Sequence, residues 1–111
     1  MIVRAQARFL RISPLKTRQL ADLIRKRDVI EASGILVSLN KRPCYFLRKL
    51  LQSAVNNAKQ KGFLPEQLYI SKITADAGPT WKRYRASAFG RAVRIRKRTT
   101  HLKIELDIKS Q

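Results

Sequence analysis

The residues with the clearest chemical potential form a cationic run near the C-terminus. Residues 77–104 contain no Asp or Glu, and Arg predominates among their cations, which suits bidentate contact with phosphate and stacking on bases. Trp81, Tyr84 and Phe89 lie between the cations and are suited to stacking on unpaired bases, as in RNA recognition. The cations are Lys82, Arg83, Arg85, Arg91, Arg94, Arg96, Lys97, Arg98 and Lys103.

A second basic cluster extends over residues 4–27 and contains a single acid, Asp22. Two cationic surfaces on a small protein favour embedding in folded RNA over lying along one groove. The cations of this cluster are Arg4, Arg8, Arg11, Lys16, Arg18, Arg25, Lys26 and Arg27.

Side chains that could support catalysis or hold a metal are scarce. His101 is the only histidine and has no neighbouring Cys or paired acids, so we interpret it as a phosphate contact or a cap at a strand entry. Cys44 is the only cysteine, so an intramolecular disulfide is excluded, and we interpret Cys44 as a packed or surface thiol. The acids lack metal-ligand spacing, and the four glycines are isolated, which excludes a glycine-rich phosphate loop. We predict no enzyme activity, cofactor or metal.

Composition narrows the class of protein further. A chain of 111 residues predicts one domain, and its net charge of +18 requires a polyanion to relieve self-repulsion. Because 44% of the residues are apolar, a disordered basic tail is excluded. We expect neither a signal peptide nor a membrane span, and the strand character of the cationic run argues against a membrane-surface helix.

Apolar periodicity predicts the elements that position these cations. Residues 2–10 alternate as a half-buried strand, with Val3, Ala5, Ala7 and Phe9 on the buried face. The strand-like segments 69–75 and 102–108 flank the cationic run, which then becomes a long hairpin.

Three helices are expected between the first two strands. Ser13-Pro14 starts the first, Asp28 caps a second that ends at about Ser38, and Pro43 opens the longest, which ends before Gly62. Their expected apolar stripes are, in order, Leu15, Leu20, Leu23 and Ile24; Val29, Ala32, Leu36 and Leu39; and Leu47, Leu50, Leu51, Ala54, Val55 and Ala58.

The predicted fold class is α+β. Three helices pack on a small three-stranded antiparallel sheet, and one long β-hairpin protrudes. Within a single domain, residues 1–111, we place the globular body at 1–78 and 102–111 and the hairpin arm at about 79–101.

Three blocks in order resemble the large-ribosomal-subunit protein family numbered twenty-two, over nearly the whole chain. The first is Ser13-Pro14-Leu15-Lys16-Thr17-Arg18 continuing to Ala21-Asp22-Leu23-Ile24-Arg25, and the second is Ser53-Ala54-Val55-Asn56-Asn57-Ala58. The third and most specific runs from Gly78-Pro79 and Lys82-Arg83 through Ala88-Phe89-Gly90-Arg91 to Arg96-Lys97-Arg98-Thr99-Thr100-His101-Leu102-Lys103-Ile104-Glu105-Leu106.

The resemblance implies a structural component of the large subunit that binds its ribosomal RNA early in assembly and bridges RNA domains. It also implies an arm tip that lines the nascent-peptide exit tunnel, so the expected partners are ribosomal RNA, neighbouring large-subunit proteins and the nascent polypeptide, without a membrane or a homo-oligomer. The expected RNA-binding residues are Arg4, Arg8, Arg11, Lys16, Arg18, Arg25, Lys26, Lys82, Arg83, Arg85, Arg91, Arg94, Arg96, Lys97, Arg98 and His101. The expected tip residues are Arg85, Ala86, Ser87, Ala88, Phe89 and Gly90.

The chain departs from the family pattern at three positions. Members commonly carry Arg or His at Ser87, often a basic residue at Phe89, and often Gly at Lys26. The tip is therefore less cationic than usual, and we expect the stem of the arm to provide the anchoring.

The residues alone leave other functions possible. They are a stand-alone architectural DNA-binding protein, an RNA chaperone, and, with least support, a hydrolase that depends on His101. The ribosome could be that of the bacterial cytoplasm or of a mitochondrion or plastid.

Overall fold

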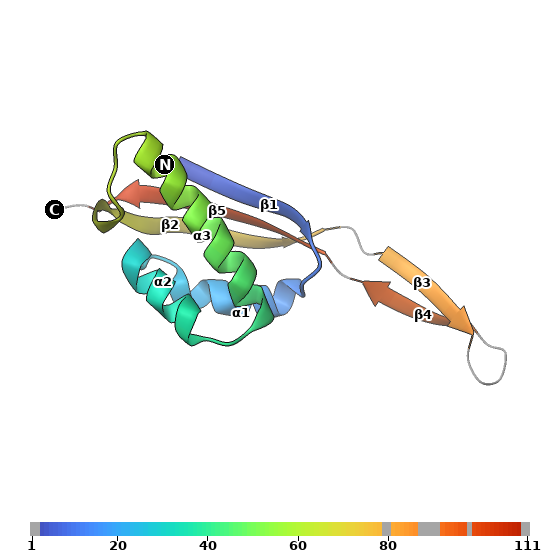
Figure 1. Cartoon of the computed structure of the whole chain (residues 1–111). Coiled ribbons are helices and arrows are strands. Elements are labelled where there is room, and N and C mark those ends of the chain that lie inside the picture. The colour runs from blue at the N-terminus through green and yellow to red at the C-terminus, as the bar shows by residue number, and fades with distance from the viewer. Residues whose placement is uncertain (1–2, 79–80, 87–91, 98, 110–111) are drawn as a thin grey trace.

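The alternation of apolar and polar residues builds a three-stranded antiparallel sheet. In the computed structural model, its strands are β1 (Val3–Leu10), β2 (Leu68–Ala77) and β5 (Thr100–Ile108), in the order β1-β5-β2. The structure describes residues 3–78, 81–86, 92–97 and 99–109, and for 81–86 and 92–97 it describes the backbone. β5, the last strand in sequence, therefore occupies the centre of the sheet (Figure 1).

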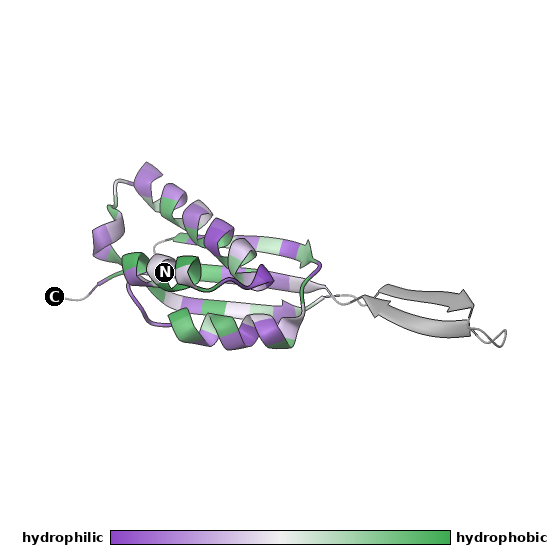
Figure 2. Ribbon diagram, turned by 60° about the horizontal axis from the view of Figure 1, so that its bottom comes forward, coloured by the Kyte–Doolittle hydropathy of each residue, from purple (hydrophilic) through white to green (hydrophobic). Residues whose placement is uncertain are grey.

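Strand register places most apolar residues of the three strands on one face. Val3 lies opposite Leu106, and Ile73 lies opposite Ile104. Figure 2 shows the alternation as green and purple bands along the strands. The sheet residues buried on this face are Val3, Ala5, Leu68, Ile70, Ile73, Ala75, Leu102, Ile104 and Leu106.

The helices cover this apolar face. They are α1 (Pro14–Ile24), α2 (Val29–Ser38) and α3 (Arg42–Gln60), and a short 3-10 helix, η1 (Pro65–Gln67), leads into β2. α3 crosses β1 and β5, α1 lies along β2, and α2 packs against α3 (Figure 1). The predicted fold class is confirmed.

The stripe predicted for α3 is confirmed in full, because all six of its apolar residues are buried. Cys44 extends the same stripe at the start of the helix. The helix ends at Gln60, and Gly62 follows with a φ of 89°, a conformation that glycine adopts without steric cost. In α2, the expected residues Val29, Ala32 and Leu36 are buried, and Leu39 is partly buried against the core.

The prediction that Leu15 and Leu23 belong to the buried stripe of α1 is wrong. Leu15 is 61% exposed and Leu23 is 46% exposed, whereas Pro14, Thr17, Ala21 and Ile24 form the buried face. Small side chains on that face let the helix approach the sheet closely. Thr17 can be buried because its hydroxyl donates to the Ser13 carbonyl at 2.7 Å. The leucines are left on the outer flank.

The prediction that Phe9 faces the core is also wrong. The pairing of β1 with β5 shifts register between Ala7 and Leu10, and Phe9 has a φ of 58°. An extra residue in one strand reverses the alternation beyond it. Phe9 is consequently 51% exposed, and Leu10 packs against the core instead.

The predicted hairpin forms a second, two-stranded sheet. It consists of β3 (Trp81–Ala86) and β4 (Ala92–Lys97), which pair antiparallel. Figure 1 shows this arm projecting from the end of the body where β2 and β5 meet it. The molecule measures 65 × 24 × 17 Å along its principal axes, so the arm gives it an elongated shape.

Candidate nucleic-acid interface

The arm carries predicted RNA-binding residues on both faces of a two-stranded ribbon. The register places Lys82 opposite Arg96, and like charges opposite each other destabilise a strand pair. Because successive residues of a strand belong to opposite faces, Lys82 and Arg83 are on different sides of the ribbon. An anionic partner reaching both sides would relieve this repulsion. The predicted RNA-binding residues on β3 and β4 are Lys82, Arg83, Arg85, Arg94, Arg96 and Lys97, and Arg91 and Arg98 lie outside the described residues. Of the predicted tip residues, Arg85 and Ala86 end β3, and Ser87, Ala88, Phe89 and Gly90 lie outside the described residues.

His101, predicted as a phosphate contact, lies at the base of the arm and organises the chain there. Its Nδ1 accepts a hydrogen bond of 3.0 Å from the backbone N–H of Phe9. The two rings meet edge to face with centroids 4.8 Å apart, and the Arg8 guanidinium lies 5.4 Å from the Phe9 ring centroid. Nδ1 is thus committed to the fold as a hydrogen-bond acceptor, and Nε2 is the ring nitrogen that this bond leaves unused.

A close backbone approach completes this arm root, which we define as Phe9, Ile12, Gly78 and residues 99–101. The Gly78 N–H donates to the Thr99 carbonyl at 2.9 Å. A Cβ on Gly78 would meet the Thr99 Oγ1 and would lie 3.0 Å from the His101 Nε2, so a side chain has no room there. The buried Thr100 hydroxyl donates to the Ile12 carbonyl at 2.7 Å, which ties β5 to the segment before α1.

Arg18 and Arg25 use part of their guanidinium groups within the fold. The Arg18 Nε donates to the Ala75 carbonyl at 2.7 Å, and the Arg25 Nη2 donates to the Ile73 carbonyl at 2.9 Å. Arg25 also pairs with Asp22. These bonds satisfy carbonyls along the outer edge of β2 and so cover a sheet edge that could otherwise pair with another chain.

Lys26 follows α1 in a left-handed conformation, with a φ of 65°. Its backbone N–H donates to the Ile70 carbonyl at 2.9 Å, and the Ile70 N–H donates to the Arg27 carbonyl at 3.0 Å. The turn therefore pairs with the edge of β2. The exposed Lys26 side chain stays available to solvent or to a partner.

Arg4 and Arg8 lie on the sheet face that the helices leave open. Cross-strand neighbours give this face mixed charge, because Arg4 and Lys72 both lie opposite Glu105. A shallow hollow of about 140 Å³ between these residues is lined by both signs of charge. The mixed charge makes this face a poorer candidate for anion binding than the arm, where residues 81–86 and 92–97 contain no acid.

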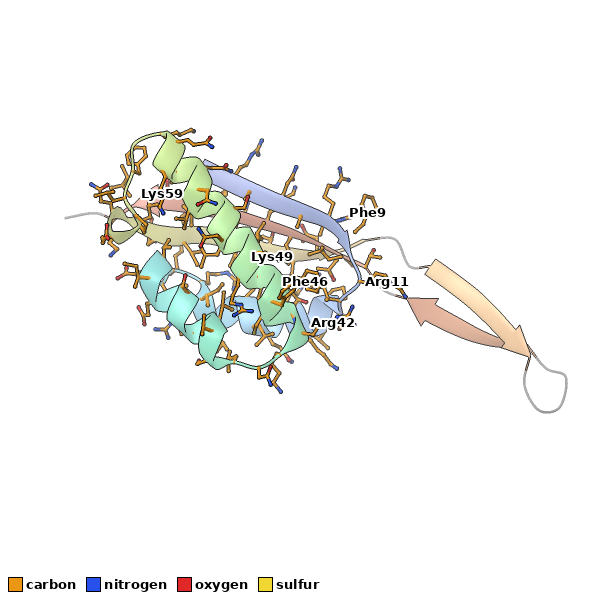
Figure 3. The ribbon with its side chains drawn as sticks, in the orientation of Figure 1. Phe9, Arg11, Arg42, Phe46, Lys49 and Lys59 are labelled. Carbon is orange, nitrogen blue, oxygen red and sulfur yellow. The ribbon has the colours of Figure 1, made fainter. Side chains whose placement is uncertain are left out.

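Arg11 and Lys16 lie at the end of the body that faces the arm, and two cations distant in sequence join them there. A groove is lined by Arg11 and Lys16 on one side and by Lys41 and Arg42, at the start of α3, on the other. Figure 3 shows Arg11 and Arg42 at this end of the body. Our sequence prediction missed Lys41 and Arg42. The available signal was a helix that opens with two cations and no acid, against the preference of the helix dipole.

The remaining candidates for chemistry are Cys44 and the metal-ligating residue types. Cys44 is buried, and that burial raises the pKa of its thiol despite a hydrogen bond at the Lys41 backbone and the positive charges of Arg48 and Lys41. The described residues contain no cluster of three or more His, Cys, Asp or Glu that could hold a metal ion. No helix in the described part of the chain has the length and apolarity to cross a membrane.

Comparison with known proteins gives consistent matches over almost the whole chain. The profile of the family described as ribosomal protein L22p/L17e matches residues 5–107. The large ribosomal subunit protein uL22 of Halothermothrix orenii is 46% identical over 112 residues, covering 100% of this chain and 99% of its own. The proteins of the same name from Sorangium cellulosum (46% over 109 residues) and Bdellovibrio bacteriovorus (41% over 110 residues) cover 96% and 98% of this chain, and 97% and 100% of their own lengths.

Proposed function

The chain belongs to the ribosomal protein L22p/L17e family, and we propose that it is held in the large ribosomal subunit by ribosomal RNA bound around its arm. It is a structural, non-enzymatic constituent of that subunit. The observation that carries the proposal is the register of β3 and β4, which distributes cations to both faces of a thin ribbon. A ribbon with so little apolar material is stabilised by phosphates that neutralise it on both sides.

Three separate regions support a role in bridging RNA domains during assembly. They are the arm, the basic groove at the arm-facing end of the body, and the turn that holds Lys26. In a molecule 65 Å long, regions at different positions reach RNA segments that are far apart in the folded subunit. Binding several segments at once makes each later contact effectively intramolecular.

The arm also supports the tunnel role that the family resemblance implies. We propose that residues 85–90 line the nascent-peptide exit tunnel, with Arg85 and Ala86 at the end of β3 leading into the tip. The stem cations would anchor the arm in RNA, and the less basic tip would face the nascent polypeptide. Neighbouring large-subunit proteins would contact parts of the body that carry little positive charge.

Incorporation of variants into large subunits tests the role of the stem. We expect Lys97→Ala/Arg98→Ala to lower the amount of tagged chain that sediments with large subunits, because about two phosphate contacts are lost. Lys59→Ala/Lys61→Ala removes the same formal charge from the C-terminal end of α3 and serves as the matched control. Ser87→Ala tests the tip.

These variants distinguish a specific role of the stem cations from a general effect of lost positive charge. The proposal predicts a large loss for the stem variant and little loss for the control and for Ser87→Ala. Equal losses from the stem variant and from Ser87→Ala would contradict it, and so would equal losses from the two double variants.

A further inference from the structure

A groove at the arm-facing end of the body combines a cationic rim with an apolar floor. It has a volume of about 590 Å³ and lies between α1 and the start of α3. Its apolar lining consists of Ile12, Leu20, Leu23 and Pro43, and its basic lining consists of Arg11, Lys16, Lys41 and Arg42. Gln19 adds an amide that can donate to or accept from a base edge.

No acidic side chain neutralises the cations of the groove rim among the described residues. The groove lining contains no Asp or Glu, and among the described residues no acidic side chain pairs with any of its four cations. Arg18, Arg25 and Arg27, by contrast, are engaged by backbone carbonyls or acids of this chain. The groove cations therefore remain available to an external anion.

Two helices also begin at this groove. Ser13 and Lys41 occupy the N-cap positions of α1 and α3, neither makes a side-chain cap hydrogen bond, and neither helix has an acid in its first turn. The positive ends of both helix dipoles thus add to the field of the four cations.

The apolar floor distinguishes this groove from a simple phosphate site. Leu23 is 46% exposed and Leu20 is partly exposed, so part of their apolar surface faces solvent within the basic rim. Exposed aliphatic side chains on α2, Ile30 and Val37, lie instead in residues 28–40, which contain no cation. A ligand that complements both floor and rim needs an apolar plane with anionic groups on either side of it, which is the chemistry of a nucleotide within an RNA strand.

We propose that this groove binds one unstacked nucleotide of ribosomal RNA. Its base lies on Leu20, Leu23 and Pro43, and the flanking phosphates contact Arg11 and Lys16 on one side and Lys41 and Arg42 on the other. The inference rests on the proposed function, since it needs ribosomal RNA as the partner. It adds a particular contact on the body that the arm does not supply.

Binding of the full chain to a large-subunit ribosomal RNA transcript, measured across salt concentrations, tests the groove. Leu23→Asn should weaken binding about fivefold to tenfold at every salt concentration, because it removes an apolar contact and no charge. Lys41→Gln/Arg42→Gln should lower the slope of log K against log salt by about 1 to 2, because up to two phosphate contacts are lost. Leu15→Asn, on the same helix but outside the groove, should bind like the wild type.

Three outcomes would overturn the proposal or its premise. If Leu23→Asn and Leu15→Asn bind equally well, no base occupies the floor. If p-benzoylphenylalanine at position 23 crosslinks in assembled subunits to a neighbouring protein instead of ribosomal RNA, the occupant is a polypeptide. If the wild-type chain itself fails to bind the transcript, the proposed function fails, and the groove inference fails with it.

Discussion

The cations near α1 divide into those that serve the fold and those that remain available to a partner. Arg18 and Arg25 donate to carbonyls along the edge of β2, while Arg11 and Lys16 have no acidic partner among the described residues. A substitution at Arg18 or Arg25 would therefore affect stability as well as RNA binding. Arg11 and Lys16 are cleaner probes of binding because their loss leaves the sheet edge covered.

Lys26 gives a prediction about backbone strain. Its φ of 65° places a residue with a Cβ in the left-handed region just after a helix, where glycine is favoured. Lys26→Gly should raise the free energy of unfolding by about 1 kcal/mol, measured by urea denaturation. Lys26→Ala removes the same charge but keeps a Cβ in the left-handed conformation, so it is the matched control. A Lys26→Gly chain less stable than Lys26→Ala would show that the turn is unstrained.

At the scale of elements, the bulge in β1 and the arm root act together. The extra residue in β1 turns the Phe9 backbone N–H toward His101, whose ring then packs on Phe9. Thr99 and Thr100 connect the same region to Gly78 and to Ile12. The arm is therefore attached to the body through hydrogen bonds on three segments that are distant in sequence.

Two glycine substitutions should have opposite effects on stability. Gly78→Ala places a Cβ against Thr99 and His101, and such crowding should lower the free energy of unfolding by about 1 to 3 kcal/mol. Gly34→Ala lies in α2, where nothing is within 4 Å of the new Cβ, and should raise it by up to about 1 kcal/mol through helix propensity. Thermal unfolding followed by circular dichroism measures both changes. A Gly78→Ala chain as stable as the wild type would contradict the role given to the arm root.

At the scale of the whole molecule, the basic surface extends along the arm and continues into the groove at the base of the arm. Figure 3 shows Arg11 and Arg42, two of the groove cations, at the end of the body from which the arm projects in Figure 1. We expect the mixed-charge open face of the sheet to contribute less to anion binding. Ribosomal RNA would therefore contact chiefly the arm-bearing end, with the turn at Lys26 as a further contact, and the exposed face of α2 would be free for solvent or protein.

Local patterns were sufficient to predict the elements and the arm. The α3 stripe and the alternation in β5 persist because each follows a single period over many residues. The prediction for α1 was wrong because residue size does not decide burial there: the smaller Thr17 and Ala21 allow close packing on the sheet and form the buried face. The prediction that Phe9 is buried was wrong because a bulge reverses the alternation, and no local sequence pattern marks the bulge. Lys41 and Arg42 reach the groove only through packing of α3 beside α1, which no pattern within either segment encodes.

The most direct test of the central claim compares the affinity of the full chain for large-subunit ribosomal RNA with its affinity for duplex DNA across a salt titration. The account predicts tighter binding to the ribosomal RNA at every salt concentration, with an affinity that falls steeply as salt rises, because phosphate neutralisation and shape fit act together. Equal affinity for the two nucleic acids, or binding that is insensitive to salt, would contradict it.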